Sequence, residues 1–310
     1  NMTATYRSKT ATARLAIVGV VGTISGLKFP KYLVSSPNGA YVFVCNDHAK
    51  MVSVINTTSQ TVIKSIPVGL YPRYITSSPA SSLVFVANEG DKTISVIDIA
   101  GLELVRTVAH RAIPSGLAIS PDGTRLYVTN YDTNSVSIIN TADMAIIETI
   151  DVGVNPSSPI INPDGTLLFI SNFSSNTVSV IDATKLTLLK TISVGLNPAA
   201  AACSPDGSRV FVCNQPRGPV SVIETTGLEV IQNIDTNTHS SGITSSPDGS
   251  FLFVSHTMND KVSVIDNAGL AMMMTITVGR NPIGIASSPD SSRIYVANSS
   301  ADTVSVISVG

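Results

Sequence analysis

Residues 120–130 read SPDGTRLYVTN, and this pattern returns at intervals of 42 residues along the chain. Three positions mark each unit: a proline, an asparagine nine residues later (a histidine in one unit) and a serine seven residues beyond that. The prolines are Pro37, Pro79, Pro121, Pro163, Pro205, Pro247 and Pro289. The asparagine position holds Asn46, Asn88, Asn130, Asn172, Asn214, His256 and Asn298. The serines are Ser53, Ser95, Ser137, Ser179, Ser221, Ser263 and Ser305. Seven equal units without insertion or deletion predict a repeat protein.

Each unit predicts four short strands. In the unit that contains Asn130, the expected strands cover residues 116–120, 125–129, 136–139 and 146–150. The first two are joined by a Pro-Asp-Gly turn, because proline presets φ and glycine accepts a positive φ. Apolar and polar residues alternate in the strands, which is the period of a β-strand. Four strands in a repeat of this length are typical of a propeller blade. We therefore expect an all-β fold, a seven-bladed β-propeller of four-stranded antiparallel blades.

The two ends of the chain predict how the ring closes. The last unit stops at Gly310 after its third strand, and residues 19–25 align with the fourth strand of the other units. We expect this N-terminal strand to complete the last blade, because closure removes two exposed sheet edges. The propeller then covers residues 17–310, and residues 1–16 form a tail outside the repeat. The apolar run at 15–21 is thus interpreted as part of this strand rather than as a signal peptide.

Two further repeated features are interpreted as structural. Asp122, Asp164, Asp206 and Asp248 occupy one turn position, where aspartate commonly bonds the nearby backbone. The recurrent asparagine is expected to end the second strand and to bond its own turn. An aromatic residue stands six positions after each proline and is expected to lie between blades. These aromatic residues are Phe43, Phe85, Tyr127, Phe169, Phe211, Phe253 and Tyr295.

The composition excludes several classes of protein. With 43% hydrophobic and 13% charged residues, the chain has ample core material and too little charge to be disordered. A net charge of −2 gives no general reason to expect nucleic acid or an anionic membrane as a partner. No apolar run is long enough for a membrane-spanning helix. Three cysteines, Cys45, Cys203 and Cys213, are too few for a disulfide framework.

The motifs also resemble a known family. Residues 127–130 read Tyr-Val-Thr-Asn, and the chain also carries SPDG at 120–123, VSVID at 178–182 and VGVNP at 152–156. With these motifs, residues 17–310 resemble the YVTN family of β-propeller repeats. The resemblance implies a seven-bladed propeller of a kind found on surface-layer and other exported proteins, so we expect a periplasmic, cell-surface or extracellular location. The chain is more distantly similar to lactonase-type propellers and to the heavy chains of some periplasmic dehydrogenases.

Departures from the repeat indicate where function resides, since shared residues report on the fold. The loops from fourth to first strand and from second to third strand are expected to open on one face, beside the channel mouth. The first of these loops reads Asn-Pro-Ser-Ser at 155–158, but Phe-Pro-Lys-Tyr at 29–32 and Tyr-Pro-Arg-Tyr at 71–74. Lys28, His110, Arg111 and Arg280 flank these two segments in equivalent loops.

We expect this basic, aromatic sector to bind a ligand. Lysine and arginine hold carboxylates or phosphates, and tyrosines stack or hydrogen-bond. The alternative is structural: the tyrosines fill a wider part of the channel and the cations extend to solvent. The candidate ligand-binding residues are Phe29, Lys31, Tyr32, Tyr71, Arg73, Tyr74, His110 and Arg111.

Other kinds of site have little support. His48, His110, His239 and His256 fall in the same loops or strand ends, but no spacing typical of a metal site connects them, so no metal is predicted. Motifs of serine hydrolases, P-loop nucleotide binding and redox cysteine pairs are missing, and no cofactor is predicted. Cys213 shares its position with other small residues, which indicates packing rather than a nucleophile.

The sequence therefore favours a non-catalytic binding or scaffolding propeller that uses one face for a protein partner or a small anionic ligand. Two alternatives stay open. One is an enzyme of lactonase, isomerase or lyase type, with its site at the channel mouth among Lys31, Tyr32, Arg73 and Tyr74. The other, least favoured, is single-stranded nucleic acid bound to the same sector.

Overall fold

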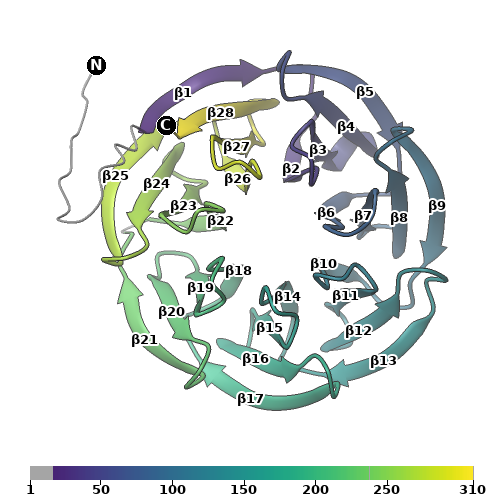
Figure 1. Cartoon of the computed structure of the whole chain (residues 1–310), viewed down its shortest axis with the longest axis vertical. Helices are drawn as coiled ribbons and strands as arrows, with labels where there is room; N and C mark the ends of the chain where they lie inside the picture. Colours follow the sequence, from purple (N-terminus) through teal and green to yellow (C-terminus); the bar gives the residue numbers. More distant parts are fainter. Residues whose placement is uncertain (1–16, 237, 310) are drawn as a thin grey trace.

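The computed structural model describes residues 17–236 and 238–309, which form seven four-stranded antiparallel sheets arranged around a central axis (Figure 1). The predicted seven-bladed propeller is confirmed. The predicted tail at residues 1–16 lies outside the described residues. Among the residues described, the one helix is a single 3-10 turn, η1 (Asp47–Ala49).

The two inner strands of each blade follow the predicted pattern. The innermost strands begin at the loop proline in six blades, because proline fixes φ where an extended segment starts. They are β2 (Pro30–Ser35), β6 (Pro72–Ser77), β10 (Pro114–Ile119), β14 (Pro156–Ile161), β18 (Pro198–Cys203), β22 (Ser240–Ser245) and β26 (Pro282–Ser287). The second strands end on the repeated asparagine or His256. They are β3 (Tyr41–Asn46), β7 (Leu83–Asn88), β11 (Arg125–Asn130), β15 (Leu167–Asn172), β19 (Arg209–Asn214), β23 (Phe251–His256) and β27 (Arg293–Asn298).

The third strands are nearly all buried, and the fourth strands form the outer rim. The third strands are β4 (Met51–Asn56), β8 (Thr93–Asp98), β12 (Ser135–Asn140), β16 (Thr177–Asp182), β20 (Val220–Glu224), β24 (Lys261–Asp266) and β28 (Thr303–Val309). The outer strands are β5 (Thr61–Pro67), β9 (Glu103–Ala109), β13 (Ile146–Asp151), β17 (Thr187–Ser193), β21 (Glu229–Ile234), β25 (Ala271–Thr277) and β1 (Ile17–Ile24). We number the blades in chain order, so blade 1 holds β2–β5 and blade 7 holds β26–β28 with β1.

The ring closes between the two ends of the chain, as predicted. Strand β1 pairs antiparallel with β28, so blade 7 combines residues from both termini (Figure 1). Ile24 is buried in the same cluster as Val304 and Val306 of β28. This pairing satisfies the edge of β28, which would otherwise present unpaired backbone groups to solvent.

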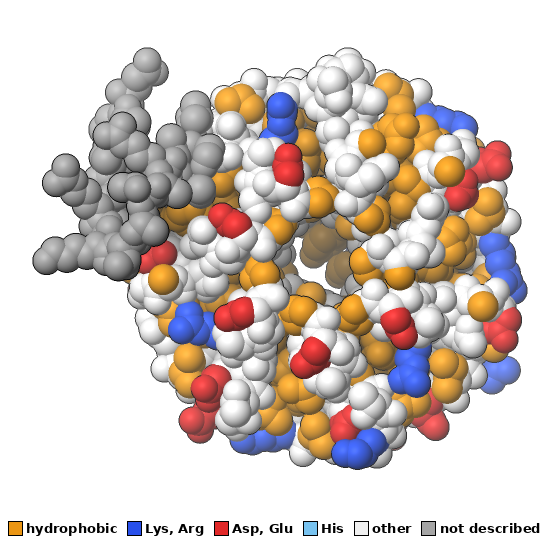
Figure 2. Space-filling model, viewed as in Figure 1, with side chains coloured by type: hydrophobic (Ala, Val, Ile, Leu, Met, Phe, Trp, Pro, Cys, Tyr) orange, Lys and Arg blue, Asp and Glu red, His pale blue; other side chains and the backbone are white. Residues whose placement is uncertain are grey.

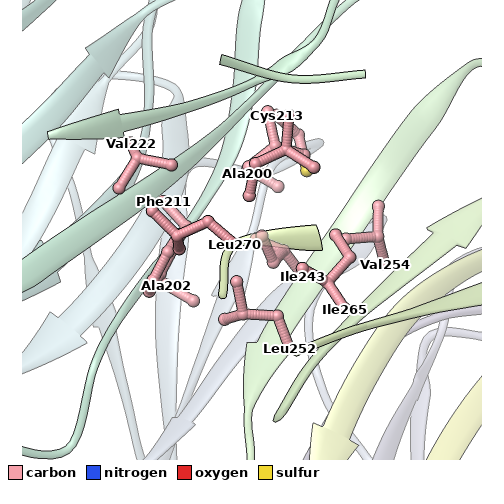
Figure 3. Close-up of a cluster of buried hydrophobic side chains, with 12 residues drawn as sticks. Ala200, Ala202, Phe211, Cys213, Val222, Ile243, Leu252, Val254, Ile265 and Leu270 are labelled. Carbon is pink, nitrogen blue, oxygen red and sulfur yellow. The ribbon is translucent and has the colours of Figure 1, made fainter. Parts of the chain in front are cut away.

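The core consists of apolar clusters between neighbouring blades. One cluster joins blade 5, through Phe211 and Val222, to blade 6, through Leu252 and Ile265 (Figure 3). All seven repeated aromatic residues have at most 1% of their surface exposed. Each ring is a large side chain buried between two sheets, so the predicted position of the aromatic residue between blades is confirmed.

The recurrent asparagine makes a bond that was not predicted, beside the predicted backbone bond at its turn, which occurs for Asn46 and Asn214. In six blades its Nδ2 donates to the serine hydroxyl seven residues later, at 2.9 Å, as in the Asn130–Ser137 and Asn172–Ser179 pairs. In blade 6, His256 Nε2 makes the corresponding bond to Ser263, at 2.7 Å. The fixed seven-residue spacing thus reflects a buried bond between the second and third strands.

The first strands surround the channel, and small residues let them approach. A Cβ on Gly284 would collide with the carbonyl oxygen of Lys31 in the next blade.

The turn aspartates lie on the face opposite the candidate site; Asp122, for example, accepts bonds from Ser120 and Thr124. Figure 2 shows acidic side chains around the central opening on the face turned to the viewer.

Candidate functional site

The two sets of loops that were expected to share a face do so. Asp47 N donates to Phe29 O at 3.2 Å, and Glu89 N donates to Tyr71 O at 3.1 Å. Each bond ties the loop after a second strand to the loop that enters the same blade. Side chains from both loops therefore converge beside the end of the channel, and those of blades 1 and 2 differ most from the repeat.

The entry loops of blades 1 and 2 place aromatic residues in an unusual backbone conformation. Phe29 has φ 53° and Tyr71 has φ 51°, and at the equivalent position three other blades place Asn155, Asn197 and Asn281 with similar values. Asparagine tolerates the left-handed region, whereas a bulky aromatic residue rarely adopts it. Such strain persists where surrounding contacts enforce it, and it is concentrated at functional sites.

The contacts of Phe29 show what holds it. Its ring stacks on His48 with centroids 4.3 Å apart and planes 5° apart. Lys31 Nζ lies 4.7 Å from the centre of the same ring, a cation–π distance. Tyr71, in the equivalent position of blade 2, is exposed. Blade 1 thus has a packed aromatic and cationic unit, and blade 2 presents a free aromatic ring on the same face.

Both cations of the site are paired with carboxylates. Lys31 Nζ lies 4.0 Å from Asp47 Oδ2, and Arg73 Nε lies 3.6 Å from Asp47 Oδ1. Arg73 Nη1 also lies 2.6 Å from Glu89 Oε2. The side chain of Asp47 is 2% exposed, whereas those of Lys31 and Arg73 are 19% and 40% exposed. One buried carboxylate is therefore held between cations from two adjacent blades.

Asp47 and Glu89 were missed by the sequence analysis, although a signal was present. Both directly follow the repeated asparagine. The other blades carry uncharged residues at this position: Tyr131, Phe173, Gln215, Thr257 and Ser299. Acidic residues thus occur in the same two blades that carry Lys31 and Arg73. The charges of Lys31 and Arg73 are therefore balanced by those of Asp47 and Glu89.

Burial and charge shift the pKa values of these groups. Burial lowers the pKa of Lys31, and Asp47 partly opposes this. Burial would also lower the pKa of Arg73, but Glu89 and Asp47 outweigh it, so the pKa is raised. Burial raises the pKa of Tyr32 and of Tyr74. Arg73 thus keeps its charge at neutral pH, and both phenols keep their protons.

The two tyrosines line the channel itself. Their rings stack with centroids 4.7 Å apart and planes 25° apart. They border a space of about 180 Å³ that is lined by the first strand of every blade. The equivalent positions hold Gly116, Ser158, Ala200, Gly242 and Gly284. The tyrosines therefore narrow one side of a channel whose other sides carry small side chains.

The structure brings together some of the predicted site residues and separates others. Lys31 and Arg73 meet at Asp47, and Tyr32 stacks on Tyr74. His110 and Arg111 instead line a different hollow, beside the third and fourth strands of blade 3. Arg280 and Lys28 are exposed beside the sector and form no ion pair with a described residue, although the backbone of Lys28 donates to Asn46.

The histidines and cysteines add no metal or thiol site. The described residues hold no cluster of three or more side chains that could ligate a metal. His239 and His256 lie close together, and burial lowers the pKa of His256 to about 4. All three cysteines are unpaired. Burial raises the pKa of Cys203 to about 12 and raises those of Cys45 and Cys213, which leaves these thiols protonated.

No helix in the described ranges is long and apolar enough to cross a membrane.

Comparisons with known proteins agree with this architecture. The structure resembles hydrazine synthase of Kuenenia stuttgartiensis with a TM-score of 0.83, over 94% of this chain and 98% of that chain. The two sequences are 22% identical, so this similarity shows the shared fold alone. A comparison with curated protein sequences gives no match.

The family comparison confirms the resemblance to lactonase-type propellers. The family described as "Lactonase, 7-bladed beta-propeller" matches residues 62–187 and 226–310, which together make up more than half of the chain. The matched segments include Arg73, Tyr74 and Glu89, whereas Lys31, Tyr32 and Asp47 lie outside them. The chain belongs to the family of seven-bladed lactonase-type β-propellers.

Proposed function

We propose that the chain is a binding propeller that takes a small anion, or the acidic group of a partner, at the channel mouth of blades 1 and 2. The observation that carries this proposal is the state of Arg73. Its guanidinium is partly exposed, and its ion pairs engage Nε and Nη1. Arginine has five N–H donors, and no described residue bonds Nη2. A carboxylate or phosphate can therefore bind this free edge.

The two carboxylates support binding rather than prevent it. Asp47 and Glu89 hold the planar guanidinium from two sides, so little side-chain freedom is lost when a ligand arrives. Glu89, which is half-buried on a loop, lies against Nη1 of the same guanidinium and would repel an anion bound beside it. This repulsion predicts selectivity for ligands that offer more than one contact.

The tyrosines supply such contacts. Because burial raises the pKa of Tyr32 and of Tyr74, both hydroxyls carry protons at neutral pH. A phenolic O–H donates to an anionic oxygen, and the stacked rings offer an apolar wall. The channel space of about 180 Å³ beside them favours a small ligand over a polymer. Single-stranded nucleic acid has less support, since it is a polymer.

A thermal-shift screen tests this function. The probes are acetate, malate, citrate and inorganic phosphate, compared at equal ionic strength. We expect at least one to raise the unfolding temperature of the wild-type protein, because a ligand bound at 100 times its Kd stabilises by about 2.7 kcal/mol. Arg73→Gln abolishes the shift, and Arg217→Gln, an exposed cation of blade 5, retains it. An equal shift in both variants contradicts the proposal.

Hydrolysis of a lactone is the second candidate, and the family match favours it. Glu89 or Asp47 would take a proton from water as the water adds to the lactone carbonyl. Arg73 would stabilise the oxyanion before the ring C–O bond breaks and the leaving oxygen is protonated. Release of a hydroxy acid can be followed by titration at constant pH. Under this mechanism Glu89→Gln loses turnover; a wild-type protein without turnover on γ- and δ-lactones eliminates the candidate.

A further inference from the structure

A second hollow lies on blade 3, apart from the channel. Its volume is about 670 Å³, within the range of small-molecule sites. It is bordered by the loop that enters blade 3, by the end of β11 and by strands β12 and β13. Tyr32 and Tyr74 line the channel space and do not border this hollow.

Three departures from the repeat create the hollow and its chemistry. His110 and Arg111 occupy positions that read Val-Gly in four other blades, at 68–69, 152–153, 194–195 and 278–279. Ser135 occupies a position that holds Met51, Thr93, Thr177, Pro219, Lys261 and Thr303 elsewhere. Ser135 is the smallest of these residues. Blade 3 thus combines an opened space with two polar side chains that the fold does not require.

The hydrogen bonds determine which groups face a ligand. Asn130 Nδ2 donates to Ser135 and Ser137, each at 2.9 Å, so its Oδ1 faces His110. His110 Nε2 lies 2.7 Å from this oxygen and is therefore the protonated nitrogen. In the described part of the chain, no residue bonds His110 Nδ1, which is left as an acceptor. Ser137 accepts from Asn130 and keeps its own proton for donation.

The rim of the hollow carries balanced charge and one apolar wall. Arg111 is exposed on one element and Asp151 on another, so the rim offers donors and acceptors without a net charge. Thr149 adds a hydroxyl, and Ile146 is 44% exposed. Hydroxyl groups act as donors and acceptors at once, and the C–H face of a sugar ring packs on apolar side chains. An anion would meet Asp151, whereas a neutral polyol fits every one of these groups.

We propose that this hollow binds a small polyol of the monosaccharide class, with His110, Ser137 and Arg111 as its hydrogen-bonding groups. The site is independent of the channel mouth, and either can fail without the other. The ligand accepts a bond from Ser137 or Arg111 and donates one to His110 Nδ1. Its ring lies against Ile146.

Titration by NMR tests the proposal with D-glucose, D-galactose and myo-inositol as probes, and with the His110 imidazole resonances as the reporter. We expect saturable shifts at Nδ1 with at least one probe. His110→Val weakens binding about tenfold, since it removes the hydrogen bond between the ligand and His110 Nδ1. Val is the residue of four other blades at this position, so the fold is retained.

Two further variants keep the test decisive. Ser135→Met, which introduces the residue of blade 1, fills the hollow and is expected to abolish the shifts. Arg217→Gln, on the same face but in blade 5, leaves them unchanged. The proposal is overturned if no probe shifts His110 up to its solubility limit, or if His110→Val and Ser135→Met bind as the wild type does. For His110→Val, binding is followed through the Ser137 and Thr149 amide resonances.

Discussion

The loops of blades 1 and 2 and the loops of blades 4 and 5 occupy equivalent positions but differ in chemistry. In blades 1 and 2 they carry two cations and two carboxylates, of which Arg73 and Asp47 pair across the blade boundary. The corresponding segments at 152–155, 173–176 and 194–197 contain no charged residue, and Val154 and Leu196 are exposed. The remaining loop, at 215–218 in blade 5, carries one charge, that of Arg217. One repeat therefore supports two unlike surfaces on the same face.

This comparison separates what the fold requires from what it permits. The buried aromatic residue and the asparagine–serine bond occur in both regions, so they serve the propeller. The charged network occurs in one region alone, and its charges are not needed to build a blade, since the equivalent positions of the other five blades are uncharged. Departures from the repeat, rather than the repeat itself, therefore carry information on function.

The largest expected effect is at the shared core. Phe43→Ala in blade 1 and Phe169→Ala in blade 4 each remove a ring that is at most 1% exposed. Each is expected to lower the free energy of unfolding by about 3–5 kcal/mol, measured by chemical denaturation. If the two decreases in the free energy of unfolding differ by more than this range, the two blades do not contribute equally to the fold, and the comparison fails.

The next effect concerns the charged network. Asp47→Asn leaves Lys31 and Arg73 without their shared carboxylate and is expected to cost about 2 kcal/mol, since Asp47 is buried but its partners are partly exposed. A double-mutant cycle of Asp47→Asn with Arg73→Gln measures the coupling by urea unfolding. The exposed pair Lys92–Asp132 is the control and is expected to show weaker coupling. Equal coupling would mean that burial adds nothing to the network.

A smaller, pH-dependent effect belongs to His256, which replaces the repeated asparagine. Burial lowers its pKa to about 4, so the unfolded chain binds a proton more readily than the folded one. Its stabilising contribution is present above pH 6.5 and is lost as the pH falls towards 4. Between pH 7 and pH 5.5 the loss is about 1 kcal/mol. Thermal unfolding across this range should show a flatter profile for His256→Asn; identical profiles would exclude this role.

The smallest effect is expected in the uncharged loops. Leu196→Ser changes a side chain that is 62% exposed, so the free energy of unfolding should change by less than about 0.5 kcal/mol. Binding at the channel mouth should also be unaffected, as judged by the thermal-shift screen. A large loss of stability would show that the uncharged loops, too, contribute to the fold.

Much of the fold could be predicted because each unit repeats the same local signals. The turn at 121–123 and the alternation in 136–139 predict strands within one or two residues of β10–β13. Closure followed from register alone, since residues 19–25 align with other fourth strands. The asparagine was predicted to bond its turn, whereas the partner that recurs in six blades is the serine on β12 or its equivalent, which pairing between strands brings near.

The site was predicted less completely, for two physical reasons. Arg73 bonds Asp47 across a blade boundary, and this contact depends on the angle between blades rather than on local sequence. His110 was grouped with Lys31 because both lie in entry loops, but its ring turns towards Asn130. Residues at similar loop positions thus face either the channel or the outer part of a blade, and one sequence does not reveal which.

Replacing the charged residues of blades 1 and 2 with the residues of blade 4 tests directly whether the charged network binds an anion. The variant combines Lys31→Ser and Arg73→Ser with Asp47→Phe and Glu89→Phe, and removes all four charges together. Isothermal titration with the anion that stabilises the wild-type protein should give saturable binding in the wild type and none in the variant, while the variant retains the folded circular-dichroism spectrum. Binding of equal affinity in both proteins would contradict the account.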